Sequence, residues 1–278
     1  MRIAYLGPAG TFTEDALRGA LAAGTAYEAL RTATIRDAIL AVERGDAERA
    51  LVPFENSIEG SVRSTLDTLA FEAGGVTIVG EHDFAVRAML IAREEIELER
   101  IETVISHPQP LAQCARFLRK QIPGAARRSV ESTAAAVQLV SESEQPWAAI
   151  GAGAAAELYD CTILREGIED EANNVTRFVW IAPAGAEPSG AGTWKTSLVF
   201  SELGEDHPGA LVNALREFSS REVNLTRIES RPLRLELGRY MFFCDLEGAL
   251  SESPVEEAVE ALRGKADSVR ILGSYPTA

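Results

Sequence analysis

The stretch "RIAYLGPAGTFTEDALRGALAA", residues 2–23, decides the fold class of the first part of the chain. Its first five residues predict a short apolar strand, and a glycine-containing turn follows. An amphipathic helix is expected next, because four apolar side chains share one helical face: Ala16, Leu17, Ala20 and Leu21. Thr11 and Glu14 have capping-box spacing, and Thr13 is a competing N-cap. A strand that turns directly into a helix is the repeating unit of an α/β domain.

The same alternation continues to about residue 180. Further strands are expected at "RALVPF" (49–54), at "IETVISH" (101–107) and from Thr176 onward, and residues 76–92 resemble two paired strands. Helices are expected within 33–47, 61–71, about 110–120 and 132–143, and "WAAIGAGAAAELY" (147–159) predicts a strand that turns into a helix. The first region is therefore predicted to be α/β, with ligands binding at its strand-to-helix turns.

A segment rich in Pro, Gly, Ala and Ser, "IAPAGAEPSGAGTW" (181–194), separates a second region from the first. We expect three parts: a first domain over 1–182, a linker over 183–194 and a second domain over 195–278. In the second domain, strands are expected at 195–203, 224–232, 239–248 and 268–276, and helices at 207–222 and 253–266. The order βαββαβ predicts a ferredoxin-like sandwich, a fold that serves as enzyme, dimerisation module or ligand sensor.

Composition excludes several classes of protein. The 278 residues carry a formal net charge of −15, which argues against a nucleic-acid binder. No apolar run is long enough to span a bilayer, and the N-terminus lacks the apolar core of a signal peptide, so we expect a cytoplasmic protein without a membrane partner. The cysteines (Cys114, Cys161, Cys244) and the three histidines are scattered, so we expect no metal, no disulfide framework and no cofactor.

Four polar turns are the candidate ligand site: "GPAGTFTEDA" (7–16), "VPFENSIEGSV" (52–62), "SHPQPLAQC" (106–114) and "ANNVTRF" (172–178). Each has a structural alternative, such as a capped helix start or a solvated edge strand. Arg177 has the chemistry to fork onto a carboxylate, but strand alternation points it to the face opposite Thr176. No nucleophile stands beside a base, and no phosphate loop occurs, so the turns predict a pocket of hydroxyls and amides without naming a reaction.

Seven motifs together resemble the prephenate dehydratase family: "GPAGTFTEDA", "VPFENSIEGSV", "SHPQPLAQC", "ESTAAA", "NNVTRF", "GALVNAL" and "IESRP". They occur in the family's order over nearly the whole chain. The resemblance implies two α/β lobes, similar to a periplasmic binding protein, with the site in the cleft. It implies loss of carbon dioxide and the ring hydroxyl from prephenate, giving phenylpyruvate. Since the chain starts at its first strand, the monofunctional form is expected.

The resemblance also assigns residues to the site. The family's essential threonine falls on Thr176, expected to donate a hydrogen bond to the departing hydroxyl. Its other catalytic pocket residues fall on Asn56, Ser106 and Gln113. The remaining expected substrate-binding residues lie in matching motifs: Thr11, Glu55, Ser57, Thr133, Arg177 and Phe178. A structural role is favoured for Glu55. Neutral donors suit this chemistry, because a strong cationic clamp on the carboxylate that leaves would stabilise the ground state.

The second region resembles an ACT domain and implies L-phenylalanine as an allosteric effector. The expected effector-binding residues are Gly209, Ala210, Leu211, Val212, Asn224, Leu225, Glu229 and Ser230. ACT domains pair across subunits, so a homodimer or homotetramer is expected. The motifs leave open whether phenylalanine inhibits or activates.

Three alternatives stay open from the residues. A solute-binding protein would share the bilobal fold but would usually carry an export signal. A pure amino-acid sensor would explain the second region but not the first. Arogenate dehydratase is the nearest enzymatic rival, because its substrate differs by an ammonium in place of a keto group.

Overall fold

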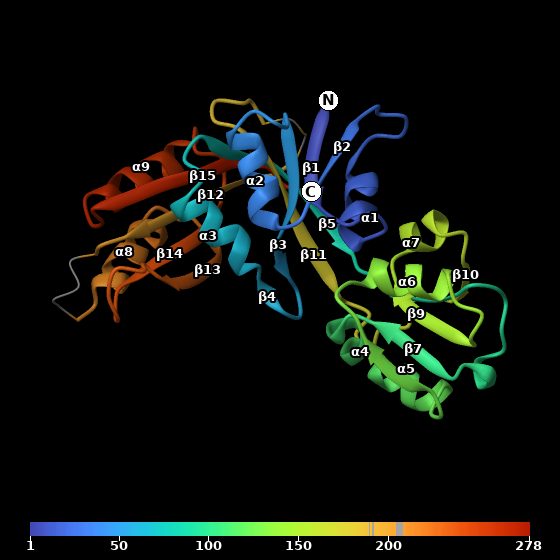
Figure 1. The fold of residues 1–278 in the computed structure, drawn as a ribbon. Helices are drawn as coiled ribbons and strands as arrows, with labels where there is room; N and C mark the ends of the chain where they lie inside the picture. The colour runs from blue at the N-terminus through green and yellow to red at the C-terminus, as the bar shows by residue number, and fades with distance from the viewer. Residues whose placement is uncertain (189, 191, 204–207) are drawn as a thin grey trace.

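Three β-sheets with flanking helices make up the fold (Figure 1). The computed structural model describes residues 1–188, 190, 192–203 and 208–278. Ser189 and Ala191 of the expected linker, and His207 at the start of an expected helix, lie outside these residues. Two sheets form the first region as two lobes, and the third sheet forms the second region. Within the described residues, no helix is long and apolar enough to cross a membrane.

The first lobe is built on a sheet of order β2-β1-β3-β11-β5, with β4 paired to β3. Its strands are β1 (Arg2–Leu6), β2 (Glu28–Thr32), β3 (Arg49–Asn56), β4 (Gly60–Ser61), β5 (Val76–Ala85) and β11 (Val175–Pro183). Its helices are α1 (Phe12–Ala20), α2 (Ile35–Glu43) and α3 (Arg63–Phe71). β1 is parallel to β2 and β3, whereas β11 runs antiparallel to β3 and β5. The last strand of the region therefore lies in the middle of the first lobe.

The second lobe is built on a sheet of order β10-β6-β9-β7-β8. Its strands are β6 (Met89–Ala92), β7 (Thr103–Ser106), β8 (Ala126–Ser129), β9 (Trp147–Gly151) and β10 (Thr162–Arg165). Its helices are η1 (Leu98–Arg100), α4 (Pro108–Gln113), α5 (Ala115–Gln121), α6 (Thr133–Ser141) and α7 (Gly153–Leu158). The single helix expected at about 110–120 is two helices, because the chain leaves helical geometry at Cys114.

Two crossover segments join the lobes. The chain leaves the first lobe after Ala85 and returns to it at Val175. The expectation of paired strands over 76–92 is wrong, because β5 and β6 belong to different sheets. The backbone N–H of Val86 donates to the carbonyl of Asn174 at 2.8 Å, so the two crossovers are tied to each other. The expected bilobal α/β fold is confirmed.

The second region has the expected βαββαβ order. Its elements are β12 (Trp194–Ser201), α8 (Ala210–Ser219), β13 (Leu225–Pro232), β14 (Tyr240–Glu247), α9 (Ser253–Arg263) and β15 (Ser268–Pro276). They form an antiparallel sheet of order β13-β14-β12-β15. Both helices pack on one face, around a core that includes Phe200, Phe218 and Leu262. β13 is an edge strand, which bears on assembly.

The other face of this sheet packs on the first lobe. Phe243, Leu272 and Tyr275 belong to the same hydrophobic cluster as Ile78 and residues of α2 and α3. β15 approaches β5 so closely that a Cβ atom on Gly273 would lie 2.2 Å from the Ile78 carbonyl oxygen. Only glycine fits this crossing without a backbone shift. The second region is therefore packed directly against the strands that carry the candidate site.

Candidate active site

A cavity of about 660 Å³ lies between the two lobes, and we call it the cleft pocket. The first lobe lines it with the β1–α1 turn and the ends of β3 and β11. The second lobe lines it with the starts of α4 and α6. Among its described lining residues, Glu131 is the one carboxylate, and there is no lysine or arginine. The pocket thus offers hydroxyls, amides and backbone N–H groups.

Two helix N-termini supply the pocket's positive potential. α1 begins at Phe12 and α6 at Thr133, and both residues line the pocket. The first N–H groups of a helix have no partner inside it, and the helix dipole is positive there. Ser132 caps α6 by accepting from the Ala135 N–H at 3.0 Å, so the Thr133 hydroxyl is not used as the cap. Anionic oxygens are the ligands that such ends favour.

The Glu14 side chain holds the turn that precedes α1. The Glu14 carboxylate accepts from the Gly10 N–H at 2.9 Å, so the expected capping box with Thr11 does not form. Thr11 is still the N-cap residue, but its hydroxyl donates to the Leu6 carbonyl at 3.4 Å. Burial alone would raise the pKa of Glu14, yet the Gly10 N–H and the Arg18 guanidinium lower it below its ordinary value. An ionised Glu14 therefore holds the glycine turn in place.

Asn56 and Thr176 are joined across the paired ends of β3 and β11. The Asn56 Nδ2 donates to Thr176 Oγ1 at 2.9 Å and to Asn174 Oδ1 at 2.8 Å. The Asn56 Oδ1 accepts from the backbone N–H groups of Ile58 and Glu59, both at 2.9 Å. Backbone N–H groups only donate, so the amide can have only this orientation.

This orientation decides the role of the Thr176 hydroxyl. A hydroxyl has one proton to donate and two lone pairs to accept with. Asn56 fills one lone pair of Thr176, and the Thr176 proton has no acceptor among the described residues. Thr176 is 9% exposed and lines the cleft pocket together with Phe178. The free proton is thus available to an oxygen bound in the pocket.

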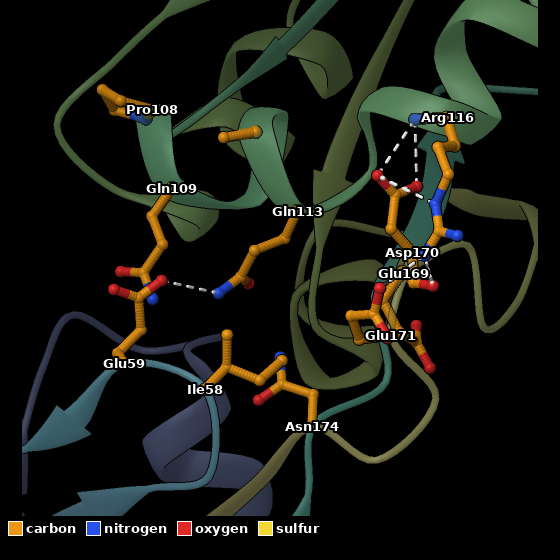
Figure 2. Close-up of a pocket in the computed structure, with 11 residues that line it drawn as sticks. Ile58, Glu59, Pro108, Gln109, Gln113, Arg116, Glu169, Asp170, Glu171 and Asn174 are labelled. Atoms are coloured by element: carbon orange, nitrogen blue, oxygen red, sulfur yellow. Dashed lines mark hydrogen bonds and ion pairs between the residues drawn. The ribbon is translucent and has the colours of Figure 1, made fainter.

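The second lobe contributes the His107 imidazole and the Gln113 amide. The His107 Nδ1 accepts from the Gln109 N–H at 3.3 Å, so a neutral His107 carries its proton on Nε2. The Gln113 Nε2 donates to the Glu59 carboxylate of the first lobe at 3.2 Å. Figure 2 shows the Gln113 and Glu59 side chains pointing toward each other between the lobes. The Gln113 amide is thus already hydrogen-bonded to a carboxylate of the protein itself.

A second cavity of about 600 Å³ adjoins the cleft pocket and shares Gln109, Gln113 and Asn174 with it (Figure 2). Its arginine, Arg116, is engaged: the guanidinium donates to the Asp170 carbonyl and to the Glu171 carboxylate. The Asp170 carboxylate also accepts from the Arg116 backbone N–H at 3.0 Å. This arginine is therefore held by the crossover segment.

Two of the expected site residues lie beneath or beside the pocket without lining it. Ser106 is fully buried, and its hydroxyl donates to the Ile150 carbonyl at 2.7 Å, joining β7 to β9. The Ser57 hydroxyl donates to the Asn173 carbonyl and accepts from the Val175 N–H. Both therefore hold the strands and loops that form the walls of the pocket.

Arg177 and Glu55 lie on the opposite face of the sheet from Thr176. The Arg177 guanidinium contacts Asp245 of β14 at 2.6 Å, Glu81 at 3.5 Å and Glu55 at 3.3 Å. It also lies over the Phe54 ring, 4.8 Å from the centroid. Burial would lower the pKa of Arg177, but the surrounding groups, with the Asp245 carboxylate first and Tyr275 and Glu81 after it, together outweigh burial and raise that pKa. Arg177 therefore ties the strand of Thr176 to the second region.

Asn174, His107 and Glu131 are among the pocket residues that the set predicted from the sequence lacks. Asn174 lines both cavities and is 3% exposed. The two consecutive asparagines before the strand indicated a polar site, but their spacing could not tell which side chain faces the pocket. A histidine beside prolines favours a structural contact, which left His107 out. Glu131 opens the "ESTAAA" motif, from which only Thr133 was assigned to the site. All three depend on how the lobes face each other.

The expected effector residues lie at the start of α8 and along β13 of the second domain. Gly209 has a φ of +92° and precedes α8, whose first turn carries the half-exposed Val212. Glu229 and Ser230 lie in the edge strand β13, opposite Phe243 and Phe242 of β14. Ala210 and Leu211 also belong to the first turn of α8, and Asn224 and Leu225 lie where the chain enters β13 after α8.

Within the described residues, no group of three or more His, Cys, Asp or Glu side chains is placed to hold a metal ion. The three cysteines are free thiols. Burial, with Asp170 nearby, raises the pKa of Cys114 to about 12. This thiol is therefore protonated at neutral pH and unsuited to nucleophilic chemistry.

A family model described as prephenate dehydratase matches residues 3–186, and an ACT domain model matches residues 202–264. A prephenate dehydratase of Mycobacterium sp. (strain JLS) is 41% identical over 285 residues, covering 99% of this chain and 89% of the relative.

Two solved structures match with high TM-scores. One is a prephenate dehydratase from Arthrobacter aurescens in complex with L-Phe, with a TM-score of 0.89, 37% identity, and coverage of 99% of this chain and 90% of that chain. The other is described as GqqA, a novel type of quorum quenching acylase, with a TM-score of 0.87, 31% identity, and coverage of 100% and 98%.

Proposed function

Because the chain belongs to the prephenate dehydratase family and is a lyase that converts prephenate to phenylpyruvate, we propose that the reaction takes place in the cleft pocket, with the Thr176 hydroxyl at the departing group. The observation that carries this assignment is the fixed Asn56 amide. It leaves the Thr176 proton free to face the pocket.

The pocket's charge fits a substrate with two carboxylates, one of which must leave as carbon dioxide. An arginine or lysine on that carboxylate would stabilise the ground state, and no such residue lines the pocket among those described. The helix starts at Phe12 and Thr133 offer N–H groups for the dianion instead. Binding therefore depends on dipoles that do not hold the reacting carboxylate too tightly.

The chemistry needs a donor at one oxygen. As the bond between the ring and the carboxylate breaks, its electron pair enters the ring, and the ring's bond to the hydroxyl oxygen breaks. The departing hydroxide ends as water after taking one proton. Thr176 stabilises the developing charge by donating a hydrogen bond, and the proton itself comes from the solvent. Donors of this kind typically contribute on the order of 100- to 1,000-fold to the rate.

Gln113 completes the site from the second lobe. Its amide donates to Glu59, a carboxylate that stands where a substrate carboxylate would bind. We expect prephenate to displace Glu59 from Gln113. Ser106 acts by holding β7 to β9 through Ile150, which positions the start of α4. Thr11, Thr133 and Phe178 shape the remaining walls.

The test is a side-by-side assay of prephenate and arogenate with purified protein. Turnover of prephenate is expected to exceed that of arogenate, because the pocket's neutral donors suit a keto group, whereas an arogenate ammonium would have a single carboxylate partner among the described lining residues. Glu131 is the candidate for that partner. Faster turnover of arogenate, lost in Glu131→Gln, would overturn the substrate assignment. Absence of turnover with both substrates would overturn the function.

L-phenylalanine is the proposed effector, bound by the second domain. Support comes from the ACT domain match and from the relative crystallised with L-Phe. Gly209 opens α8 with backbone N–H groups suited to an amino-acid carboxylate. Coupling of about 1–3 kcal/mol to the cleft is typical of such regulation. A calorimetric titration that shows no phenylalanine binding would remove the effector.

The proposed assembly is a homodimer or homotetramer that forms through β13. This strand pairs only with β14 among the described strands, and it exposes Ile228 to 43%. An unpaired edge with an exposed apolar side chain favours pairing with a second copy. Light scattering on the purified chain should report at least a dimer. A monomer at micromolar concentration would overturn this proposal.

The proposed division of the chain is a catalytic domain over 1–182, a linker over 183–194 and a regulatory domain over 195–278. The free thiols of Cys114, Cys161 and Cys244 support a reducing compartment, so we place the enzyme in the cytoplasm.

Acyl-bond hydrolysis, suggested by the likeness to the acylase, has less support. It would need a hydroxyl or thiol activated by a base. Ser106 donates to a backbone carbonyl, and the His107 imidazole has no hydroxyl partner among the described residues. We therefore do not propose it.

A further inference from the structure

Asn174 stands where the returning crossover meets β11. Its backbone carbonyl accepts from the Val86 N–H of the other crossover at 2.8 Å. Its Oδ1 accepts from the Asn56 Nδ2 at 2.8 Å, and the side chain is 3% exposed. It thus contacts both the connection between the lobes and the amide that orients Thr176.

The orientation of the Asn174 amide follows from that of Asn56. Since the Asn56 atom is a donor, the Asn174 atom that faces it must be the oxygen. The Asn174 Nδ2 is then directed away from Asn56, and it has no acceptor among the described residues. Figure 2 shows the side chain beside Ile58, at the junction of the two cavities. The Nδ2 atom is not among the fully buried side-chain atoms without a partner, so this unpaired donor is open to the cavities, where a ligand or water can accept from it.

We propose that Asn174 is a further substrate-binding residue, which donates from Nδ2 to a carboxylate oxygen of the substrate and holds the Asn56 amide with Oδ1. This inference rests on the proposed function of the cleft pocket. The two ends of one side chain then have separate tasks. Oδ1 keeps Thr176 aimed as a donor, and Nδ2 adds a neutral donor that a carboxylate can leave without a large penalty.

Asn174→Asp separates the two tasks because it keeps the shape and the Oδ1 acceptor. A purely structural Asn174 would tolerate the change, since an aspartate still accepts from Asn56. A substrate donor would not, since an ionised oxygen would face an anionic substrate. Asn173→Asp is the matched control: it adds the same charge one residue earlier, at an exposed side chain.

The experiment measures kcat and KM for prephenate in the wild type, N174D and N173D, with circular dichroism and thermal melting as checks of folding. We expect kcat/KM of N174D to fall about 10- to 100-fold, the loss typical of a hydrogen bond to a charged group. N173D should stay within about threefold of the wild type. The affinity for phenylpyruvate, measured by calorimetry, should fall in parallel for N174D alone.

A pH profile gives a second readout that a structural role would not produce. Protonation turns the carboxylate introduced in N174D into a neutral donor, so the ratio of N174D to wild-type activity should rise as the pH falls toward 5. Equal kcat/KM for N174D and N173D would overturn the inference, and so would a ratio that does not change with pH.

A second variant covers the case in which N174D does not fold. Asn174→Ala keeps the backbone bond to Val86 and removes both side-chain tasks, so kcat should fall and KM rise. Wild-type values in N174A would overturn the inference. Failure of the wild type itself to turn over prephenate would overturn the proposed function instead, which keeps the two claims distinguishable.

Discussion

The buried ion pair between Arg177 and Asp245 should contribute substantially to the free energy that holds the second region against the first. Asp245 is 1% exposed, and its two oxygens accept from Arg177 Nη2 and from the Ser197 hydroxyl, both at 2.6 Å. The change to test is Asp245→Ala. It removes one partner of the pair and leaves the cation in place, under the packed face of the second domain.

The size of the effect can be worked from the remaining partners. Removing one side of a buried pair typically costs about 3–5 kcal/mol, because the other charge stays buried without compensation. Arg177 keeps Glu81 at 3.5 Å and Glu55 at 3.3 Å, and these carboxylates offset part of the loss. We therefore expect the free energy of unfolding to fall by about 2–4 kcal/mol. The Ser197 hydroxyl retains Tyr275 as a partner, so it adds little.

The assay is urea unfolding followed by circular dichroism and tryptophan fluorescence. Asp46→Ala is the control, since Asp46 forms an exposed pair with Arg44, and such pairs contribute about 0–1 kcal/mol. The double variant Arg177→Met/Asp245→Ala should be less destabilised than the sum of the single changes, by at least about 1 kcal/mol. A loss of less than about 1 kcal/mol in Asp245→Ala, or full additivity in the double variant, would refute this account of the interface.

Other parts of the structure give three more predictions. Asn56→Asp should fold, because its Oδ1 still accepts from the Ile58 and Glu59 N–H groups. Its kcat/KM should nevertheless fall by at least about 100-fold, because the new carboxylate accepts the Thr176 proton and repels the substrate. Near-normal steady-state kinetics would contradict this. Gly273→Ala should lower the urea midpoint, with a cost of about 1–3 kcal/mol or more, because its Cβ meets the Ile78 carbonyl; an unchanged midpoint would show that β15 can shift freely. The folded-state pKa of Glu14 lies below its ordinary value, so its contribution to the free energy of unfolding is complete above about pH 5 and lost as the pH falls through the lowered pKa. Glu14→Gln should therefore reduce stability at pH 7 and flatten the acid limb of the pH–stability curve. An acid limb that matches the wild type would count against this.

Local patterns in the chain predicted most of the elements but not their partners. "RIAYL" and "GALVNALREF" have clear periods, and both form the expected strand and helix. β2 and β8 were missed because neither has a fully buried residue, so neither carries a strong apolar alternation. The crossover at residues 86–88 was missed because apolar residues continue through it into the next sheet.

The site shows the same limit. Alternation along β11 correctly separated Thr176 from Arg177, yet the partner of Arg177 lies 68 residues away in another domain. Ser106 was placed at a strand end, but its burial depends on β9, which arrives much later in the chain. The orientation of the Asn56 and Asn174 amides depends on backbone N–H groups brought together by folding, and no spacing in the sequence encodes it.

The proposed hydrogen bond from the Thr176 hydroxyl to the departing oxygen is tested most sharply by the single-turnover rate of prephenate conversion in Thr176→Val. The variant keeps the shape of the side chain and removes only the hydroxyl. We expect a rate at least about 100-fold below the wild type, with phenylpyruvate affinity nearly unchanged and partial recovery in Thr176→Ser. A Thr176→Val rate within about threefold of the wild type, in a correctly folded protein, would contradict it.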